Sequence, residues 1–327
     1  MNTETFLVTG ALGCIGAWVL RNLVKEESRT IALDLASDPI RPRLLLGPEE
    51  LERITFVQAD ITDLERLLAL IKRRRVTHII HLAALQVPPC RANPPLGARV
   101  NVVGTANVFE AARRCRDQIQ GLAYASSVAV LGPGHLYPQR PVPDDAPLHP
   151  ETLYGVYKQT NEHTARLYWQ NWGVSSIGLR PSIVYGVGRD QGLTSDVAKS
   201  ILAAAAGRPY HIKFDGPVAL QYVEDVARVF IEAARAGYTG TVAGNLRQDV
   251  SSVADFVATL QKETAGARIS YEIGHPLPFP ADLDDSGLRR ILGPIPHTPL
   301  VTAIGQTLDQ FRQLLAQERI DLAQLEP

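Results

Sequence analysis

Apolar residues in the first half of the chain form short runs that alternate with longer stretches of helical periodicity. The short runs are rich in β-branched residues, as buried strands are, and the longer stretches repeat apolar residues at three- and four-residue spacing. The pattern predicts strands over 5–10, 30–35, 54–60, 76–84, 121–127 and 175–186, and helices over 14–27, 63–74, 97–115 and 157–172. Such alternation implies right-handed crossovers and a doubly wound parallel α/β sheet with helices on both faces.

The pattern changes after about Gly186. Helical periodicity covers 194–207, 223–237, 253–266 and 301–320, and short strand patterns cover 210–214, 240–246 and 268–273. We predict a main domain over residues 1–186 and a smaller α/β substrate lobe mainly over 187–327, with the chain free to cross back between the two. The lobe is expected at the carboxyl ends of the main strands, where such folds bind ligands. The long loop over 132–150 is a candidate lining of that cleft.

Composition narrows the class of protein. The 327 residues are 45% hydrophobic and 20% charged, enough for a large core in one large or two fused domains. The formal net charge of -1 offers no attraction to nucleic acid or an anionic membrane, and the basic run 72–75 follows a helical pattern whose dipole it complements. No signal segment or spanning apolar run is seen, and the three cysteines form no closely spaced metal pair. We expect a cytoplasmic protein without a metal.

Three glycines follow the first predicted strand in the segment VTGALGCIG. Gly10, Gly13 and Gly16 stand at three-residue spacing and open a predicted helix. A backbone without side chains can approach a pyrophosphate at the positive end of a helix. A tight turn also requires glycine, so the motif alone is weak support for a Rossmann-type dinucleotide site.

Two aspartates at strand ends strengthen that interpretation. Asp34 lies 18 residues beyond Gly16, where a carboxylate accepts hydrogen bonds from ribose hydroxyls and repels a 2'-phosphate. This favours NAD over NADP, although a solvated turn aspartate is the alternative. Asp60 ends the third strand, where it either meets the adenine amine or caps a helix starting at Thr62.

The segment YGVYKQTNE holds two tyrosines before one lysine. Tyr154 precedes Lys158 by four residues, one helical turn, whereas Tyr157 is adjacent to it. Only the first pair shares a helix face, so Tyr154 is the candidate for proton transfer and Tyr157 is expected to serve packing or an interface.

Together these segments resemble a known family. TGALGCIG, DITD, HLAA, NVVGT, ASSVAVLG, YGVYK, LRPSIVYG and YVEDVA occur in the order and approximate spacing of the extended short-chain dehydrogenase/reductase family, of the NAD-dependent epimerase/dehydratase type, over nearly the whole chain. The resemblance implies an NAD-dependent enzyme with Ser127, Tyr154 and Lys158 as its catalytic residues. A phenol with a pKa of about 10 is a poor base, and a nearby lysine ammonium and an oxidised nicotinamide would favour its phenolate.

The resemblance also implies particular contacts. Lys158 would hold the nicotinamide ribose, Ser127 would hydrogen-bond the reacting oxygen, and Asn101 would interrupt a helix with a structural or water-relay role. The implied cofactor contacts are Gly10, Gly13, Cys14, Ile15, Gly16, Asp34, Asp60, Ile61, Leu82, Ala83, Ala84, Asn101, Ser126, Tyr154, Lys158 and Pro181. The family's dimers pack two long helices per subunit into a four-helix bundle, which here would involve 100–113 and 157–169, with Val103, Val108, Leu167 and Trp169 as apolar contributors.

Departures from the family pattern bear on the substrate. The family's dehydratases and decarboxylases carry carboxylates just after the serine, where this chain has Val128 and Ala129. Its nucleotide-sugar epimerases carry an asparagine and an arginine where this chain has Ile183 and Val218, an apolar pair that cannot hold a diphosphate. Either the anchors lie elsewhere in the chain or the substrate is not a nucleotide sugar. Arg189 is the candidate replacement anchor, for a carboxylate or a phosphate, with a surface arginine as the alternative. The predicted substrate contacts are Gln86, Ser127, Val128, Ser182 and Arg189, with the loop residue His135 a weaker candidate.

The leading hypothesis is an NAD-dependent oxidoreductase acting on a secondary alcohol of a polyol, sugar or sugar acid and releasing NADH. The first alternative is a UDP-sugar epimerase that oxidises transiently and retains its NAD. A threonine-type dehydrogenase is a minor alternative, because SSVAVLGP and YGVYKQTNE also resemble those enzymes locally. A non-catalytic NAD sensor would be expected to lack the serine, the tyrosine or the lysine, and all three are present.

Overall fold

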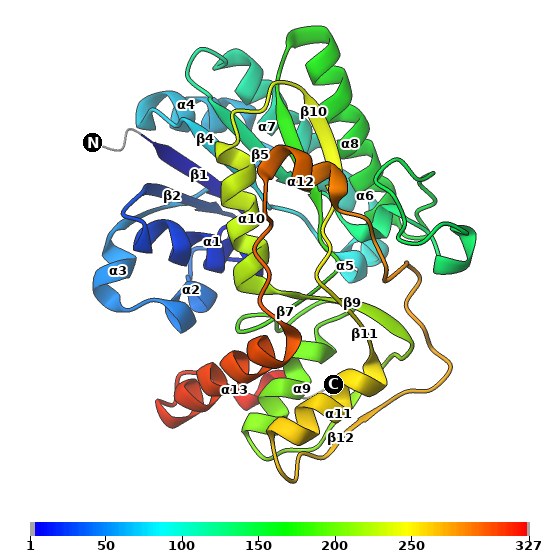
Figure 1. The fold of residues 1–327 in the computed structure, drawn as a ribbon. Helices are drawn as coiled ribbons and strands as arrows, with labels where there is room; N and C mark the ends of the chain where they lie inside the picture. The colour runs from blue at the N-terminus through cyan, green and yellow to red at the C-terminus, as the bar shows by residue number, and fades with distance from the viewer. Residues whose placement is uncertain (1–3, 326–327) are drawn as a thin grey trace.

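A seven-stranded parallel sheet forms the centre of the main domain in the computed structural model, which describes residues 4–325. Its order is β10-β6-β5-β4-β1-β2-β3 (Figure 1). The strands are β1 (Thr5–Thr9), β2 (Arg29–Asp34), β3 (Ile54–Gln58), β4 (His78–His81), β5 (Gly121–Ala125), β6 (Ser176–Arg180) and β10 (Thr241–Asn245). The order reverses direction between β1 and β4, which opens a crevice at their carboxyl ends. The predicted Rossmann-type α/β fold is confirmed.

Helices cover both faces of this sheet. Side chains alternate along β1: Phe6 and Val8 belong to the apolar core beneath α1 and α10, and Leu7 belongs to the core beneath α4 and α7. The longer helices of the main domain are α1 (Cys14–Lys25), α4 (Leu64–Arg74), α7 (Gly104–Arg114), α8 (Leu153–Trp172) and α10 (Val223–Arg235). The basic run 72–75 ends α4, as its position predicted. The shorter ones are α2 (Ile40–Leu45), α3 (Pro48–Glu52), α5 (Val87–Ala92), α6 (Pro94–Ala98) and α12 (Ser286–Leu292).

A smaller lobe lies beyond the carboxyl ends of the main strands, at the bottom of Figure 1. It holds a three-stranded sheet of order β11-β9-β7 and a two-stranded sheet of β12 and β8. Its elements are β7 (Ile183–Tyr185), α9 (Asp196–Ala205), β8 (Tyr210–Ile212), β9 (Pro217–Tyr222), β11 (Asp249–Ser252), α11 (Val253–Glu263), β12 (Ile269–Tyr271) and α13 (Leu300–Ala316). Short 3-10 turns lie at Val128–Val130, Gly134–Leu136 and Leu322–Leu325.

The chain crosses back to the main domain after entering this lobe. Helix α10 packs on α1, and β10 pairs in parallel with β6. The sequence pattern assigned the segments 223–237 and 240–246 to the smaller lobe. In the structure the first is a helix that covers the main sheet, and the second adds a strand to it. The division at Gly186 marks where the chain first leaves that sheet, and it stays a prediction as a domain boundary.

Two predicted elements are interrupted. The strand predicted over 175–186 is two strands in different sheets, because Pro181 has no N–H to continue the ladder after β6. The helix predicted over 97–115 contains a π-helical turn, Arg99–Val103, between α6 and α7. Such turns are frequent at functional sites, and this one carries Asn101.

The long loop 132–150 has an apolar core of its own. Val128, Leu131, Tyr137 and Val142 are buried together, and the Tyr137 hydroxyl donates to the Pro147 carbonyl at 3.0 Å. His135 is exposed on this loop. The loop is thus packed in place, while its contact with substrate stays a prediction.

Between residues 4 and 325 no helix is both long and apolar enough to cross a membrane. Of the apolar residues expected at a helical interface, Val103 and Leu167 are exposed and Trp169 is half-buried. Val108 is buried in the subunit's own core, a place that its apolar side chain suits equally, and so it is not part of an exposed helical face.

Candidate active site

The glycine turn, residues 9–16, joins β1 to α1 at the crevice between β1 and β4. Gly10 has a φ of +66°, and a Cβ there would lie 2.5 Å from the backbone nitrogen of Ala83. A Cβ on Gly16 would lie 2.4 Å from the carbonyl oxygen of Gly10. Neither position tolerates a side chain, so the turn presents bare backbone at the start of α1. This geometry fits a pyrophosphate at the helix N-terminus.

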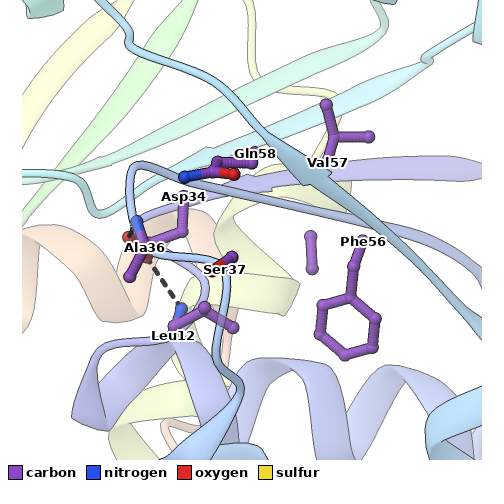
Figure 2. A pocket seen from close by; sticks show the side chains of 8 residues that line it. Leu12, Asp34, Ala36, Ser37, Phe56, Val57 and Gln58 are labelled. Atoms are coloured by element: carbon purple, nitrogen blue, oxygen red, sulfur yellow. Dashed lines mark hydrogen bonds between the residues drawn. The ribbon is translucent and has the colours of Figure 1, made fainter.

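Asp34 ends β2 beside this turn. Its carboxylate accepts the N–H groups of Leu12 at 2.9 Å and Ala36 at 3.1 Å. Figure 2 shows the carboxylate at a pocket of about 180 Å³. The pocket is lined by Leu12, Ala32, Asp34, Ala36, Ser37, Phe56, Val57 and Gln58. An acidic group with fixed orientation, next to apolar surface, suits the ribose and adenine of NAD, and the alternative of a freely solvated turn aspartate does not describe it.

Asp60 lies at the end of the neighbouring strand. Its carboxylate accepts the Thr62 N–H at 2.8 Å, but α4 begins at Leu64 and is capped by Asp63. The alternative in which Asp60 caps a helix at Thr62 was therefore wrong. Its contact with the adenine amine stays a prediction.

The three predicted catalytic residues come together where β5 ends and α8 begins. Ser127 follows β5; its hydroxyl accepts the Ala129 N–H at 3.1 Å and is near enough to the Tyr154 phenol to lower the pKa of that phenol. Lys158 lies one turn along α8, with Nζ 5.6 Å from the centre of the Tyr154 ring. Its ammonium donates to the Ala125 carbonyl at 2.7 Å. The Thr152 hydroxyl, which accepts the Gly155 N–H, caps the helix that carries both residues.

Burial dominates the ionisation of these groups. It raises the pKa of the Tyr154 phenol, and the hydrogen bond from Ser127 and the charge of Arg189 offset part of the rise. Burial also lowers the pKa of Lys158 to about 8. Desolvation thus outweighs the lowering of the phenol's pKa that was expected from a neighbouring cation, and the cation that lowers this pKa is Arg189.

Tyr157 faces a different neighbour. Its hydroxyl donates to the Pro94 carbonyl at 3.0 Å, and its ring packs against Gly97. The residue therefore fastens α8 to α6 within the subunit, in agreement with the packing role predicted for it.

A buried network, which the sequence interpretation missed, supports the catalytic helix. Glu162 lies one turn beyond Lys158 and forms a bidentate ion pair with Arg180, with both N–O distances at 2.8 Å. The Ser126 hydroxyl donates to the same carboxylate. Since Ser126 precedes Ser127, this network fixes the end of β5 against α8. The Tyr154, Lys158 and Glu162 spacing of four residues was the available sequence signal.

Asn101 has a structural role in the π-helical turn. Its side chain accepts the Leu85 N–H and donates to the Leu85 carbonyl, both at 2.8 Å. This pair fixes the strand end at Leu82, Ala83 and Ala84, which faces the glycine turn. Of the other predicted cofactor contacts, Cys14 and Ile15 begin α1, Ile61 packs on Gly104, and Pro181 accepts the Val128 N–H; their contact with NAD stays a prediction.

The predicted substrate residues divide into two groups. Gln86 and Arg189 both approach Gly192, in the loop 186–194 that we call the arginine loop. Ser182 lies at the lobe boundary, with a buried hydroxyl that has no hydrogen-bond partner. Val128 is buried in the core of the long loop, which does not support a side-chain contact with substrate.

The apolar positions Ile183 and Val218 are fully internal, at 0% and 2% exposure. They lie on β7 and β9, the strands of the small lobe, and pack in its core. Neither supplies a polar group to the site.

Arg41, which the sequence interpretation also missed, connects the two sides of the site. It donates to Asp190 at 3.1 and 2.7 Å and to the Leu12 carbonyl at 3.1 Å. The arginine loop is thereby tied to the glycine turn. Among residues 4–325 no group of three or more acidic, histidine or cysteine side chains is arranged to hold a metal ion.

Comparison with known proteins agrees with this geometry. The sequence model of the NAD-dependent epimerase/dehydratase family matches residues 6–245. The UDP-glucose 4-epimerase of Mycolicibacterium smegmatis is 32% identical over 323 residues, which cover 94% of this chain and 98% of that protein.

Solved structures support the fold. The UDP-glucose 4-epimerase of Thermotoga maritima, solved with UDP-glucose, superposes with a TM-score of 0.82 at 24% identity and covers 95% of this chain and 100% of its own. A partial consensus L-threonine 3-dehydrogenase gives the same TM-score of 0.82, identity of 24% and coverage of 95% and 100%. At this level of identity the two enzymes establish a shared architecture.

Proposed function

This chain belongs to the NAD-dependent epimerase/dehydratase family, and we propose that it is an oxidoreductase that takes a hydride from a secondary alcohol of a carbohydrate-like or polyhydroxy-acid substrate. NAD is its cofactor. The observation that carries the proposal is the placement of the Tyr154 phenol beside the buried Lys158, whose ammonium lies 5.6 Å from the phenol ring, with Ser127 at the adjoining end of β5. A phenol, a hydroxyl and an ammonium placed together serve proton transfer from an alcohol.

Each residue of this group has a separate task. Tyr154, as the phenolate, accepts the proton of the substrate hydroxyl. Ser127 donates to the substrate oxygen and stabilises its partial negative charge. Lys158 keeps positive charge next to the phenol, and Arg189 adds to it. When bound, NAD accepts the hydride that leaves the same carbon, so the alcohol becomes a carbonyl compound.

The chain's own residues would hold NAD in a fixed orientation. The glycine turn offers backbone to the pyrophosphate, and Asp34 offers a carboxylate to the adenosine ribose. Lys158 is directed toward the ribose of the nicotinamide in this proposal. Asp34 also disfavours a 2'-phosphate, in keeping with NAD.

A UDP-sugar 4-epimerase is the second candidate, because the Mycolicibacterium relative with that name spans nearly the whole chain. Such an enzyme would use Ser127, Tyr154 and Lys158 in the same way, to oxidise the sugar transiently during epimerisation. Against it stand Ile183 and Val218, which are apolar and buried where a diphosphate would need donors and cations. A threonine-type dehydrogenase remains a minor candidate through the shared fold.

The proton-transfer role is tested by comparing Tyr154→Phe with Tyr157→Phe. The first removes the hydroxyl proposed to accept the substrate proton, and we expect turnover to fall by about 10²–10⁴-fold. The matched control removes the hydroxyl bonded to Pro94 and should leave turnover within a few-fold. Steady-state rates of NADH formation measure both, and a Tyr154→Phe protein with normal turnover would refute the assignment.

Net oxidation and epimerisation are separated by product analysis. Purified protein is assayed for retained NAD and then offered free NAD with sugars, sugar acids or UDP-glucose. Steady NADH release excludes a pure epimerase. Formation of the isomeric UDP-sugar without NADH release excludes the net dehydrogenase.

We also propose a homodimer in the cytoplasm. Val103 and Leu167 are exposed on the two helical segments that pair in the family's four-helix bundle, and Trp169 is half-buried. Sedimentation of the wild type and of Leu167→Glu tests this assembly, because a charge at the centre of the bundle should give monomers.

A further inference from the structure

The arginine loop places one cation at the catalytic site without a carboxylate partner. Arg41 is paired with Asp190, and Arg180 is paired with Glu162. Arg189 forms no ion pair with any residue in the described range 4–325, and its side-chain donor bond goes to the neutral Thr194 hydroxyl at 3.2 Å. Its Nε is buried and has no acceptor. The protein therefore leaves part of the hydrogen-bonding capacity of this guanidinium unused.

The guanidinium lies between the two functional sides of the site. Its charge acts on the Tyr154 phenol and on Cys14, the first residue of α1 in the glycine turn. Nη2 lies 3.2 Å from the position that a Cβ would take on Gly192, and Gln86 Oε1 lies 2.0 Å from the same position. Gly192, with a φ of +101°, thus leaves room for two polar side chains to meet. The glycine turn is tied to this loop, since Asp190, next to Arg189, pairs with Arg41, which also donates to the Leu12 carbonyl.

From this arrangement we infer that Arg189 is the anion anchor of the substrate site and that the substrate carries a carboxylate, as a sugar acid or polyhydroxy acid does. The inference rests on the proposed oxidation and names its substrate class. Gln86 is placed to add a hydrogen bond to the same substrate end. Thr194 holds the guanidinium in position.

Charge balance favours a carboxylate over a diphosphate. Arg41 and Asp190 neutralise one another, so the arginine loop contributes one net positive charge through Arg189. A carboxylate brings one negative charge and matches a single guanidinium fork. A nucleotide diphosphate brings about two, and the apolar Ile183 and Val218 provide nothing to balance the second.

The test compares acid and neutral probes of the same configuration. D-gluconate and D-glucitol are offered with NAD, and NADH formation is followed together with probe binding to the NAD-loaded protein by calorimetry. We expect the wild type to favour gluconate by about 10²-fold or more in affinity or kcat/KM. Arg189→Ala should lower kcat/KM for gluconate by about 10²-fold more than for the neutral probe, with the excess in KM, because any effect of Arg189 on the Tyr154 phenol is common to both probes. Arg189→Lys should recover part of the loss.

A matched control is Arg208→Ala, which removes an exposed arginine outside the site and should change neither probe. Equal loss for acid and neutral probes, or no preference of the wild type for the acid, overturns the inference. Where the inference is overturned in this way, NADH formation from neutral sugars still supports the proposed oxidation. Gluconate binding that depends on Arg189, with no NADH from any alcohol, would leave the anchor standing without the oxidation.

Discussion

The glycine turn and the arginine loop face each other across one site, but they are fixed by different kinds of interaction. The turn is held by backbone contacts so close that Gly10 and Gly16 have no room for a Cβ. The loop is held by side-chain bonds, of which the strongest is the pair between Arg41 and Asp190. Cofactor geometry is therefore built into the main chain, whereas substrate geometry depends on a few replaceable side chains. One fold can in this way keep its cofactor and change its substrate.

Among the tests of this contrast, Gly10→Ala has the largest expected effect. The new Cβ would meet Ala83 backbone at 2.5 Å in a left-handed conformation, so we expect a loss of roughly 3 kcal/mol or more in the free energy of unfolding and a weakened NAD site. Gly173→Ala is a matched control, because Gly173 has the same φ of +66° with no atom within 4 Å of the added Cβ. It should cost only about 1 kcal/mol. Urea denaturation and NAD calorimetry measure both, and equal costs would refute a special role of close packing at the turn.

The second test concerns the ion pair behind the catalytic residues. Glu162→Gln leaves the Arg180 guanidinium, at 4% exposure, without its carboxylate, and we expect a destabilisation of about 3 kcal/mol. Turnover should fall as well, because Ser126 loses its charged acceptor next to Ser127. Glu110→Gln provides the control, since its partners Arg113 and Arg114 are 35% and 44% exposed and the loss should stay within about 1 kcal/mol at neutral pH. If the two substitutions lower the free energy of unfolding equally, burial of the pair between Glu162 and Arg180 adds nothing to stability.

The same contrast explains what the sequence could and could not predict. Gly10, Gly16 and Asp34 were predictable because the turn and strand end that need them are local in the chain. The pairing of Arg41 with Asp190 was not, because the partners are 149 residues apart and neither has a distinctive neighbourhood. Helix α10 and strand β10 carried ordinary patterns, so their return to the main sheet followed only from tertiary pairing.

Two predicted elements are interrupted in the structure, and the hydrophobic pattern alone indicated neither interruption. Pro181 marked the break between β6 and β7, since it cannot donate to a ladder. The π-helical turn at Asn101 had no such marker, because helical periodicity continues through it and the Leu85 backbone that Asn101 binds is supplied by tertiary structure. The approach of Arg189 and Gln86 at Gly192 likewise depends on a loop path that local periodicity does not define.

A third test uses pH at the long loop, where Asp144 accepts the Asn245 N–H at 2.6 Å. Burial raises the pKa of Asp144 to about 6. The folded protein therefore holds this proton more tightly than the unfolded chain does. The stability that depends on the protonated Asp144 carboxyl is fully present below about pH 4 and is lost as pH rises through 6. Asp144→Asn keeps an acceptor and removes the charge. Its free energy of unfolding relative to the wild type should therefore rise by about 1–2 kcal/mol between pH 4 and pH 7. Urea denaturation over that range checks the slope, and a difference that stays flat with pH would contradict it.

The smallest expected effect is the one that ties the two regions together. Arg41 and Asp190 are 22% and 26% exposed, so a double-mutant cycle with alanine at each position should give a coupling of about 0.5–1 kcal/mol, reduced at 1 M salt. Arg312 and Asp309 on α13, at 48% and 78% exposure, form the control pair and should couple by less. Hydrogen exchange of residues 186–194 should quicken in Arg41→Ala, because the loop loses its bond to the glycine turn. A coupling no larger than that of the control pair would mean that the turn and the loop meet without an energetic link, and substrate residues would then be free to vary without disturbing the cofactor side.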